Sequence, residues 1–347
     1  MEKCLICNKD ADQTGSHIVP HFLMKRIDNE EGSTDRDKEM GFVITEKETT
    51  SYFGQSILPE KLEEIYGDVT DELIEENEID GIVDYFFCKN CESRLANLES
   101  EYSKIFQKKI TDEENYTSFS DGFIAFVFWS SVIWRLSLQP ESDFKLKPKE
   151  ENRLQRILSK YLKDKIGDIK PDNNDSDLKN IGYKLLRAAN YSIENYTFLH
   201  SIPFYRTPYS ILIDELILFF YFKESHLKGM IQDFYGSEKL KSKAIFNKPF
   251  DEEKTLKISD QDLKDVIDRM ILKGAEVRYE YLNSLLDQLH QKLGGKGQSM
   301  YPRLKQMVIK NLLENDEKLG KRDTIPNQIE IITNTIMDYH TKANKDG

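Results

Sequence analysis

The chain has little cysteine and lacks a long uncharged hydrophobic segment. Its 347 residues include four cysteines, and the longest apolar run, residues 123–138, contains Arg135. A membrane-spanning helix needs about 20 consecutive apolar residues, so we expect a buried helix there and no membrane partner. The N-terminal sequence Met1-Glu2-Lys3-Cys4 has no apolar stretch of the kind that a secretion signal carries. We therefore expect a cytoplasmic protein.

An excess of positive charge is also missing. The formal net charge is −12, and residues 1–115 contain about twice as many acidic as basic side chains. Proteins that coat nucleic acid without sequence preference neutralise its phosphates with clustered lysine and arginine. The composition argues against that class of protein and favours solvated acidic surfaces.

All four cysteines fall into two Cys-x-x-Cys pairs. Cys4 and Cys7 form the first pair, and Cys88 and Cys91 form the second. Two thiolates at this spacing reach one tetrahedral metal, and two such knuckles complete the closed four-cysteine site of structural zinc. Disulfides and unrelated core cysteines are the alternatives, and disulfides need an oxidising compartment. The spacing predicts one zinc that ties the two segments together and leaves no coordination position open for chemistry.

The periodicity of apolar residues predicts a mostly helical α+β protein. Strands are predicted at residues 41–44 and 82–87, and a small antiparallel sheet at about 195–223. Trp129 and Trp134 are expected in the core. Helical spacing recurs in several further segments, which are residues 58–77, 92–108, 119–138, 149–164, 176–191, 259–293, 300–315 and 326–343.

A change in character after residue 115 predicts two parts. Residues 1–115 are expected to form a zinc-binding module, in which a strand runs into the second knuckle and a helix follows. Residues 116–347 are expected to form a larger helical domain with the small sheet, because their aromatic residues and long helices suffice for a separate core. This second part is the expected site for a protein partner or for a second copy of the chain.

The order of motifs in the first 110 residues resembles the zinc-bearing HNH endonucleases, which belong to the His-Me finger (ββα-metal) group. A cysteine knuckle precedes Ser16-His17-Ile18-Val19-Pro20, and a strand, the second knuckle and a helix follow. The resemblance implies a treble-clef zinc module with an HNH-like arrangement. It also implies that His17 is the general base and that the zinc ligands are Cys4, Cys7, Cys88 and Cys91.

Three positions depart from the family pattern. The aspartate before the histidine is Ser16 here, the asparagine before the third cysteine is Val83, and the histidine after the second knuckle is Glu92. A hydroxyl is a poor replacement for a carboxylate on Mg²⁺. Glu92, in contrast, is a reasonable ligand for Mg²⁺ or Mn²⁺, and Asp84 is a second candidate.

The resemblance implies metal-dependent hydrolysis of phosphodiester bonds in nucleic acid, with DNA favoured over RNA. The chain also resembles uncharacterised bacterial proteins of this zinc-histidine type, which implies phage defence as a setting. His17 would take a proton from water, and Mg²⁺ or Mn²⁺ at Glu92 would stabilise charge on the phosphate. Further along the same helix, Glu99 is expected either to orient a metal ligand without touching the ion or to pair with Arg94 or Lys25. The lost aspartate and asparagine favour the alternative, a catalytically inactive zinc-stapled binding or scaffold protein.

Overall fold

A computed structural model of the protein describes most of the chain. The described residues are 3–13, 16–23, 40–44, 49–53, 82–83, 85–107, 110–111, 113–118, 122–139, 144–189, 191, 199–202, 206–228, 233–319 and 325–343. The chain divides into two compact units. Unit 1 contains Met1–Ile27 and Gly81–Ile267, and unit 2 contains Asp28–Asp80 and Asp268–Gly347.

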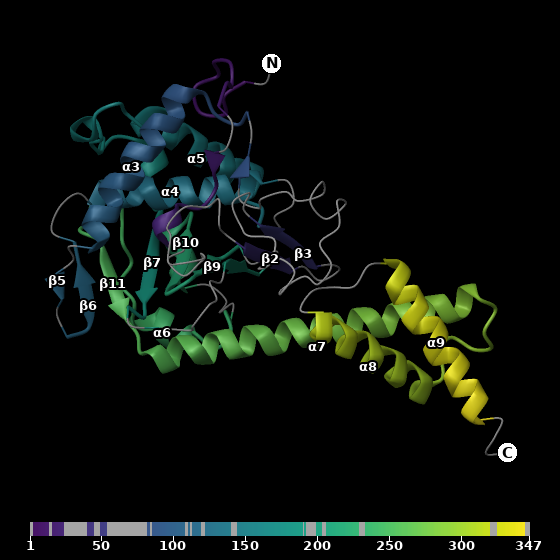
Figure 1. The fold of residues 1–347 in the computed structure, drawn as a ribbon. Helices are drawn as coiled ribbons and strands as arrows, with labels where there is room; N and C mark the ends of the chain where they lie inside the picture. The colour runs from purple at the N-terminus through teal and green to yellow at the C-terminus, as the bar shows by residue number, and fades with distance from the viewer. Residues whose placement is uncertain are drawn as a thin grey trace. The chain divides into compact units, whose positions relative to one another are not determined.

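Unit 1 is built on a mixed sheet of seven strands in the order β5-β6-β11-β7-β10-β9-β8 (Figure 1). Neighbouring strands are antiparallel except for β11 and β7, which run parallel. The strands are β5 (Ile110–Thr111), β6 (Asn115–Thr117), β7 (Gly182–Arg187), β8 (Leu199–Ser201), β9 (Tyr209–Ile213), β10 (Leu216–Tyr221) and β11 (Lys254–Lys257).

Three helices, α3 (Lys89–Gln107), α4 (Gly122–Leu138) and α5 (Pro148–Tyr161), lie over one face of this sheet (Figure 1). Side chains of a strand alternate between its two faces. Leu218 and Phe220 of β10 accordingly join the core that contains the three helices. The intervening Phe219 contacts Phe234 on the opposite face, where α6 (Glu238–Lys243) packs against β7. The main core therefore lies between the helices and one face of the sheet.

The central helix α4 is apolar on all sides and buried along nearly its whole length. A helix of that kind needs neighbours all round, and α3 and α5 both pack against it. Trp129 and Trp134 are fully buried in this core, as expected. No helix among the described residues is both long and apolar enough to cross a membrane.

A buried carboxylate joins three of these elements to the approach to β11. Glu253 accepts hydrogen bonds from Tyr102 of α3 at 2.9 Å, from Trp129 of α4 at 3.0 Å and from Tyr183 of β7 at 2.6 Å. Burial first, and then the charge of Glu253, raise the pKa values of Tyr102 and Tyr183 well above 10. Both tyrosines therefore stay protonated and remain donors, which is what a buried carboxylate requires.

Two smaller sheets and the C-terminal helices complete the described structure. In unit 1, β1 (Ser16–His17) pairs with β4 (Ile82–Val83), and in unit 2, β2 (Met40–Ile44) pairs with β3 (Thr49–Phe53). The core of unit 2 comes from the later part of α7 and from α8 and α9. The remaining elements are α7 (Asp260–Lys292), α8 (Pro302–Leu319), α9 (Ile325–Ala343), η1 (His21–Leu23), η4 (Ile166–Asp168), η5 (Ser176–Leu178) and η6 (Glu224–Lys228).

The predicted fold class, a mostly helical α+β protein with a sheet, is confirmed. The helix predicted at residues 176–191 is wrong, because this segment contains η5 and β7, and the strand predicted at 82–87 is limited to β4. The sheet also draws on more of the chain than residues 195–223. The helix predicted at residues 58–77 lies outside the described residues.

One core spans the boundary predicted at residue 115. Tyr102 of α3 stacks on Phe128 of α4 with ring centroids 4.0 Å apart, and Leu95 and Leu98 belong to the same buried cluster as Leu218 of β10. The compact units therefore do not follow residues 1–115 and 116–347, because α3 contributes its apolar face to the core of the later residues.

The Glu253 network predicts a specific loss of stability. Glu253→Ala leaves two tyrosine hydroxyls and an indole N–H without their acceptor, and we expect it to lower the free energy of unfolding by about 3 kcal/mol. Urea denaturation followed by circular dichroism measures this loss. The control is Glu252→Ala, which removes an exposed neighbour and should change little. Equal stabilities of the two variants would contradict the structural role of Glu253.

Candidate metal centre

The four cysteines meet at the N-terminal end of α3. Cys88 directly precedes this helix and Cys91 lies in its first turn, while Cys4 and Cys7 come from the N-terminal knuckle. All four Sγ atoms lie within 4.8 Å of one another, and those of Cys7 and Cys88 are 3.6 Å apart. Tetrahedral zinc–sulfur bonds of about 2.3 Å place the sulfur atoms about 3.8 Å apart. The cluster therefore has the size that one metal ion requires.

Backbone hydrogen bonds shape the first knuckle and fasten it to the second. The N–H of Cys4 donates to the carbonyl of Lys9 at 2.7 Å, and the N–H of Asn8 donates to the carbonyl of Cys4 at 2.9 Å. Asn8 has a φ of 62°, a left-handed conformation that asparagine tolerates better than most residues. Leu5 then donates its N–H to the carbonyl of Phe86 at 2.9 Å. The turn therefore holds its two cysteines against the approach to α3.

The thiols differ in how readily they ionise. Burial, followed by the neighbouring sulfur atoms, raises the pKa of Cys91 far above its usual value, and burial also raises the pKa of Cys7. Burial opposes ionisation of Cys4 too, but backbone hydrogen bonds, chiefly those of Cys7 and Cys88, outweigh it and lower the pKa of Cys4. Four thiolates in so small a volume repel one another, so a bound cation is needed to ionise them all.

The order of elements around the cysteines is that of a treble clef. The first knuckle is followed by β1 and, later in the chain, by its antiparallel partner β4, the second knuckle and α3. In β1, Ser16 pairs with Val83 and His17 pairs with Ile82. The predicted cluster of four cysteines is confirmed as a group placed to hold a metal ion, and the predicted order of strand, second knuckle and helix is present.

The structure describes the predicted catalytic residues to different extents. His17 has a defined backbone position in β1, but its side chain and the whole of Asp84 lie outside the described residues. Glu92 is half-buried in the first turn of α3, and its N–H donates to the carbonyl of Cys88 at 3.0 Å. Among the described residues, the four cysteines are the one group of three or more metal-ligating side chains placed to share an ion. A second metal site stays a prediction.

Glu99 does not form the predicted ion pair with Arg94, and the alternative partner Lys25 lies outside the described residues. Glu99 instead pairs with Arg135 of α4, with 2.7 Å between Oε1 and Nη2, and this arginine is buried. Arg94 forms a bidentate salt bridge with Asp164, with N–O distances of 2.7 and 3.2 Å. The two side chains therefore join α3 to different parts of unit 1, and Glu99 belongs to the interface between α3 and α4.

Nothing in the sequence connects α5 with the cysteines, yet this helix contacts the first knuckle. Gln155 donates a hydrogen bond to the carbonyl of Leu5, and Ser159 donates one to the carbonyl of Ile6, both at 2.6 Å. The only sequence signal for this contact is that Gln155 and Ser159 are polar and lie four positions apart. Such pairs are common on exposed helix faces, so the contact could not be predicted without the structure.

Comparisons of the chain with protein-family models, with curated proteins and with solved structures find no match. The resemblance to HNH endonucleases therefore depends on the order of motifs alone.

Removal of one sulfur ligand tests the metal centre. We expect purified wild-type protein to contain one metal ion per chain and Cys88→Ser to contain far less, because a weaker oxygen donor replaces one of four thiolates. Since metal binding contributes to folding, the variant should also unfold at lower temperature. Elemental analysis and thermal melting measure both effects. Ser100→Ala, an exposed change on the same helix, is the control; a fully metal-loaded Cys88→Ser would contradict the assignment.

Proposed function

We propose that this protein is a zinc-stabilised, metal-dependent endonuclease that hydrolyses phosphodiester bonds in nucleic acid, with DNA favoured over RNA. One observation carries the proposal: β1, which contains His17, pairs with β4, and the chain then runs within a few residues through Cys88 into α3. This ββα order beside a four-cysteine cluster is what the resemblance to HNH endonucleases implies.

Zinc is the metal that suits the cysteine cluster. Four thiolates with tetrahedral spacing favour zinc over magnesium or calcium, which prefer oxygen ligands. All four coordination positions are taken by protein sulfur, so this ion would stabilise the fold without touching substrate. Catalysis would then need a second, separate ion.

The proposed chemistry uses a base, His17, and the metal ligands Glu92 and Asp84, which lie close in sequence to the paired cysteines. His17 would accept a proton from the attacking water, since a neutral imidazole is a competent base near pH 7. Glu92, and Asp84 as a second ligand, would hold Mg²⁺ or Mn²⁺. When bound, such an ion stabilises the negative charge that develops on the phosphate and the leaving oxygen.

The setting we propose is the cytoplasm, with phage defence as the biological role and a protein partner or a second copy bound through the C-terminal helices. The four free cysteines suit a reducing compartment. Several large apolar side chains are exposed on α7 and α9, including Leu272, Ile329 and Met337. A partner that covers these side chains would remove apolar surface from water, which supports the partner.

A second candidate function is binding without catalysis. Ser16 and Val83 replace a carboxylate and an amide of the HNH pattern, and Glu99 is engaged by Arg135. These features leave Glu92 as the one candidate ligand of a catalytic ion among the described residues. They favour a zinc-stapled binding or scaffold protein.

A plasmid-nicking assay with Mg²⁺, Mn²⁺ and Ni²⁺ separates the two functions. We expect His17→Ala to lower the rate of cleavage by about 10²–10⁴ through loss of the base. Glu92→Ala should also lower it, but high Mn²⁺ should restore part of the activity, because a lost ligand weakens metal binding and leaves the base in place.

The controls must show that the fold is intact. Both variants should keep the wild-type zinc content and melting temperature, and His290→Ala of α7 should cleave like wild type. If wild-type protein cleaves neither DNA nor RNA with any of the three ions, or if His17→Ala cleaves normally, the binding function replaces the nuclease.

A further inference from the structure

The two contacts from α5 reach the peptide groups between the paired cysteines. Leu5 and Ile6 are the residues that separate Cys4 from Cys7, and their carbonyls accept the hydrogen bonds of Gln155 and Ser159 at 2.6 Å each. Gln155 and Ser159 are four positions apart, so they lie on the same face of α5, one turn from each other. One helix face therefore holds two consecutive peptide groups of the knuckle.

The same peptide groups point toward the metal-binding sulfur at their other ends. Burial opposes ionisation of the Cys4 thiol, and hydrogen bonding from the backbone of Cys7 and Ile6, together with that of Cys88, lowers its pKa. In a trans peptide the carbonyl of one residue and the N–H of the next point in opposite directions in one plane. The plane that joins Leu5 to Ile6 is thus held by Gln155 at its carbonyl end and by sulfur at its N–H end. The next plane is held in the same way by Ser159.

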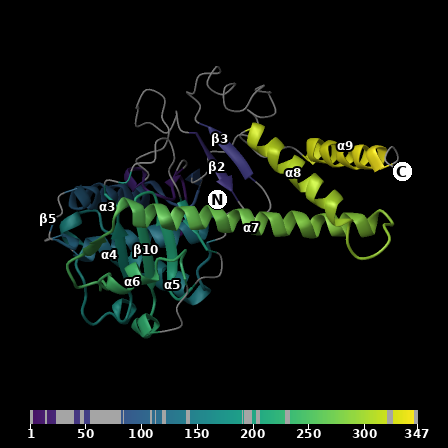
Figure 2. The same cartoon turned by 90° about the horizontal axis from the view of Figure 1, so that it is seen from below.

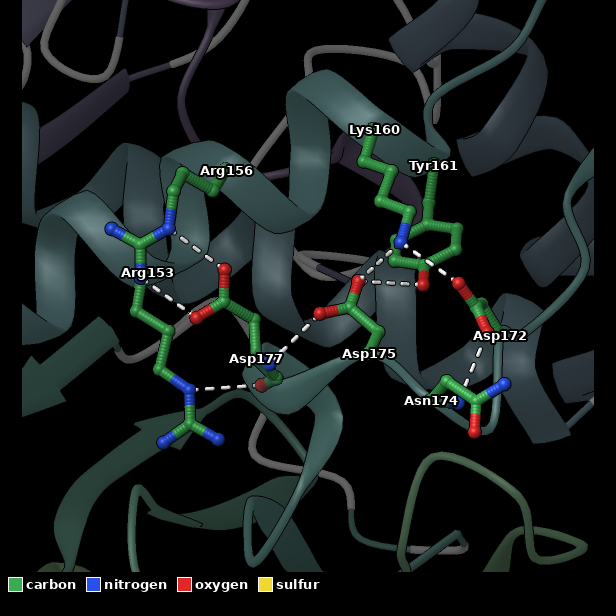
Figure 3. Close-up of polar contacts among 8 residues, drawn as sticks. All are labelled: Arg153, Arg156, Lys160, Tyr161, Asp172, Asn174, Asp175 and Asp177. Carbon is green, nitrogen blue, oxygen red and sulfur yellow. Dashed lines mark hydrogen bonds and ion pairs between the residues drawn. The ribbon is translucent and has the colours of Figure 1, made fainter.

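The helix α5 is fixed by contacts that do not involve the cysteines. Figure 3 shows its charged side chains against the loop at residues 172–177. Both guanidinium contacts of Arg156 with Asp177 measure 2.7 Å, and Lys160 lies 2.9 Å from Asp175. Arg153 donates to the backbone carbonyl of Asp177 at 2.8 Å. The apolar face of α5 is buried against α4. Gln155 and Ser159 therefore project from a helix that is held in place.

We propose that Gln155 and Ser159 are positioning residues for the metal: by holding the two peptide planes between Cys4 and Cys7, α5 sets how tightly the four cysteines bind their ion. The inference concerns the metal centre and does not depend on nuclease activity. Partners that orient metal ligands without touching the ion commonly contribute about 10–100-fold to affinity. Here both donors line a shallow pocket of about 460 Å³, so water partly replaces them, and the effect should lie near tenfold.

Thermodynamic linkage makes this coupling reciprocal. If α5 favours the geometry of the knuckle that binds the ion, then the bound ion must favour the docked position of α5 by the same factor. A loss of metal affinity in an α5 variant should therefore appear also as a smaller gain in stability when metal is added. If the α5 side chains only stabilised the fold, their substitution would lower the stability of the metal-free and metal-loaded proteins equally.

The test compares metal affinity across variants of α5 in the full chain. Zinc competition with a chromophoric chelator should show about tenfold weaker binding for the double variant Gln155→Ala/Ser159→Ala, with smaller losses for each single change. Ser159→Thr keeps the hydroxyl and should restore most of the affinity. Asn152→Ala is the matched control, because Asn152 is exposed on the same helix; its affinity should equal that of wild type.

Two further readouts distinguish positioning from general destabilisation. With Co²⁺ in place of zinc, the double variant should keep strong sulfur-to-metal charge-transfer absorption, which reports four thiolates, while its visible ligand-field bands shift as the knuckle relaxes. The rise in melting temperature on adding zinc should shrink. Wild-type affinity in the double variant, an equal loss in Asn152→Ala, or an unchanged melting difference would each overturn the proposal.

Discussion

Four sulfur atoms within 4.8 Å of one another impose the constraint on which the N-terminal part of unit 1 depends. Cys7 and Cys88 are 81 residues apart, and closing so long a loop costs conformational entropy that a short knuckle cannot offset alone. The four cysteines are placed to share a metal ion, and such an ion would supply the missing free energy, because metal binding and folding are coupled. The pairing of β1 with β4, and with it the position of His17, follows from this closure.

The helix α3 connects the cysteine cluster to the rest of unit 1. Its first turn holds Cys91, its middle pairs Glu99 with Arg135 of α4, and Tyr102 reaches the buried carboxylate of Glu253. The knuckle that contains Cys4 and Cys7 also accepts two hydrogen bonds from α5. The metal centre and the sheet are therefore parts of one cooperative structure, which explains why the chain does not divide where its composition changes.

Local patterns predicted the elements that depend on local physics. The cysteine spacing predicted the cluster, and helical periodicity predicted α3, α4 and α5. The failures come from long-range contacts. The apolar residues at positions 183, 185 and 186 suit a helix turn as well as a strand, and only pairing with β10 and β11 decides that residues 182–187 form a strand. Glu253 lies among exposed acidic residues, so nothing local marks it as buried, and its three partners come from distant segments.

We expect a metal ion bound only by sulfur to hold the two knuckles together, so that a catalytic ion needs a separate site. X-ray absorption at the zinc edge of the purified protein tests this claim most directly. We expect four sulfur neighbours at about 2.3 Å and no nitrogen or oxygen ligand. A shell that contains histidine nitrogen or water oxygen, or protein purified without chelator that contains no zinc, would contradict it.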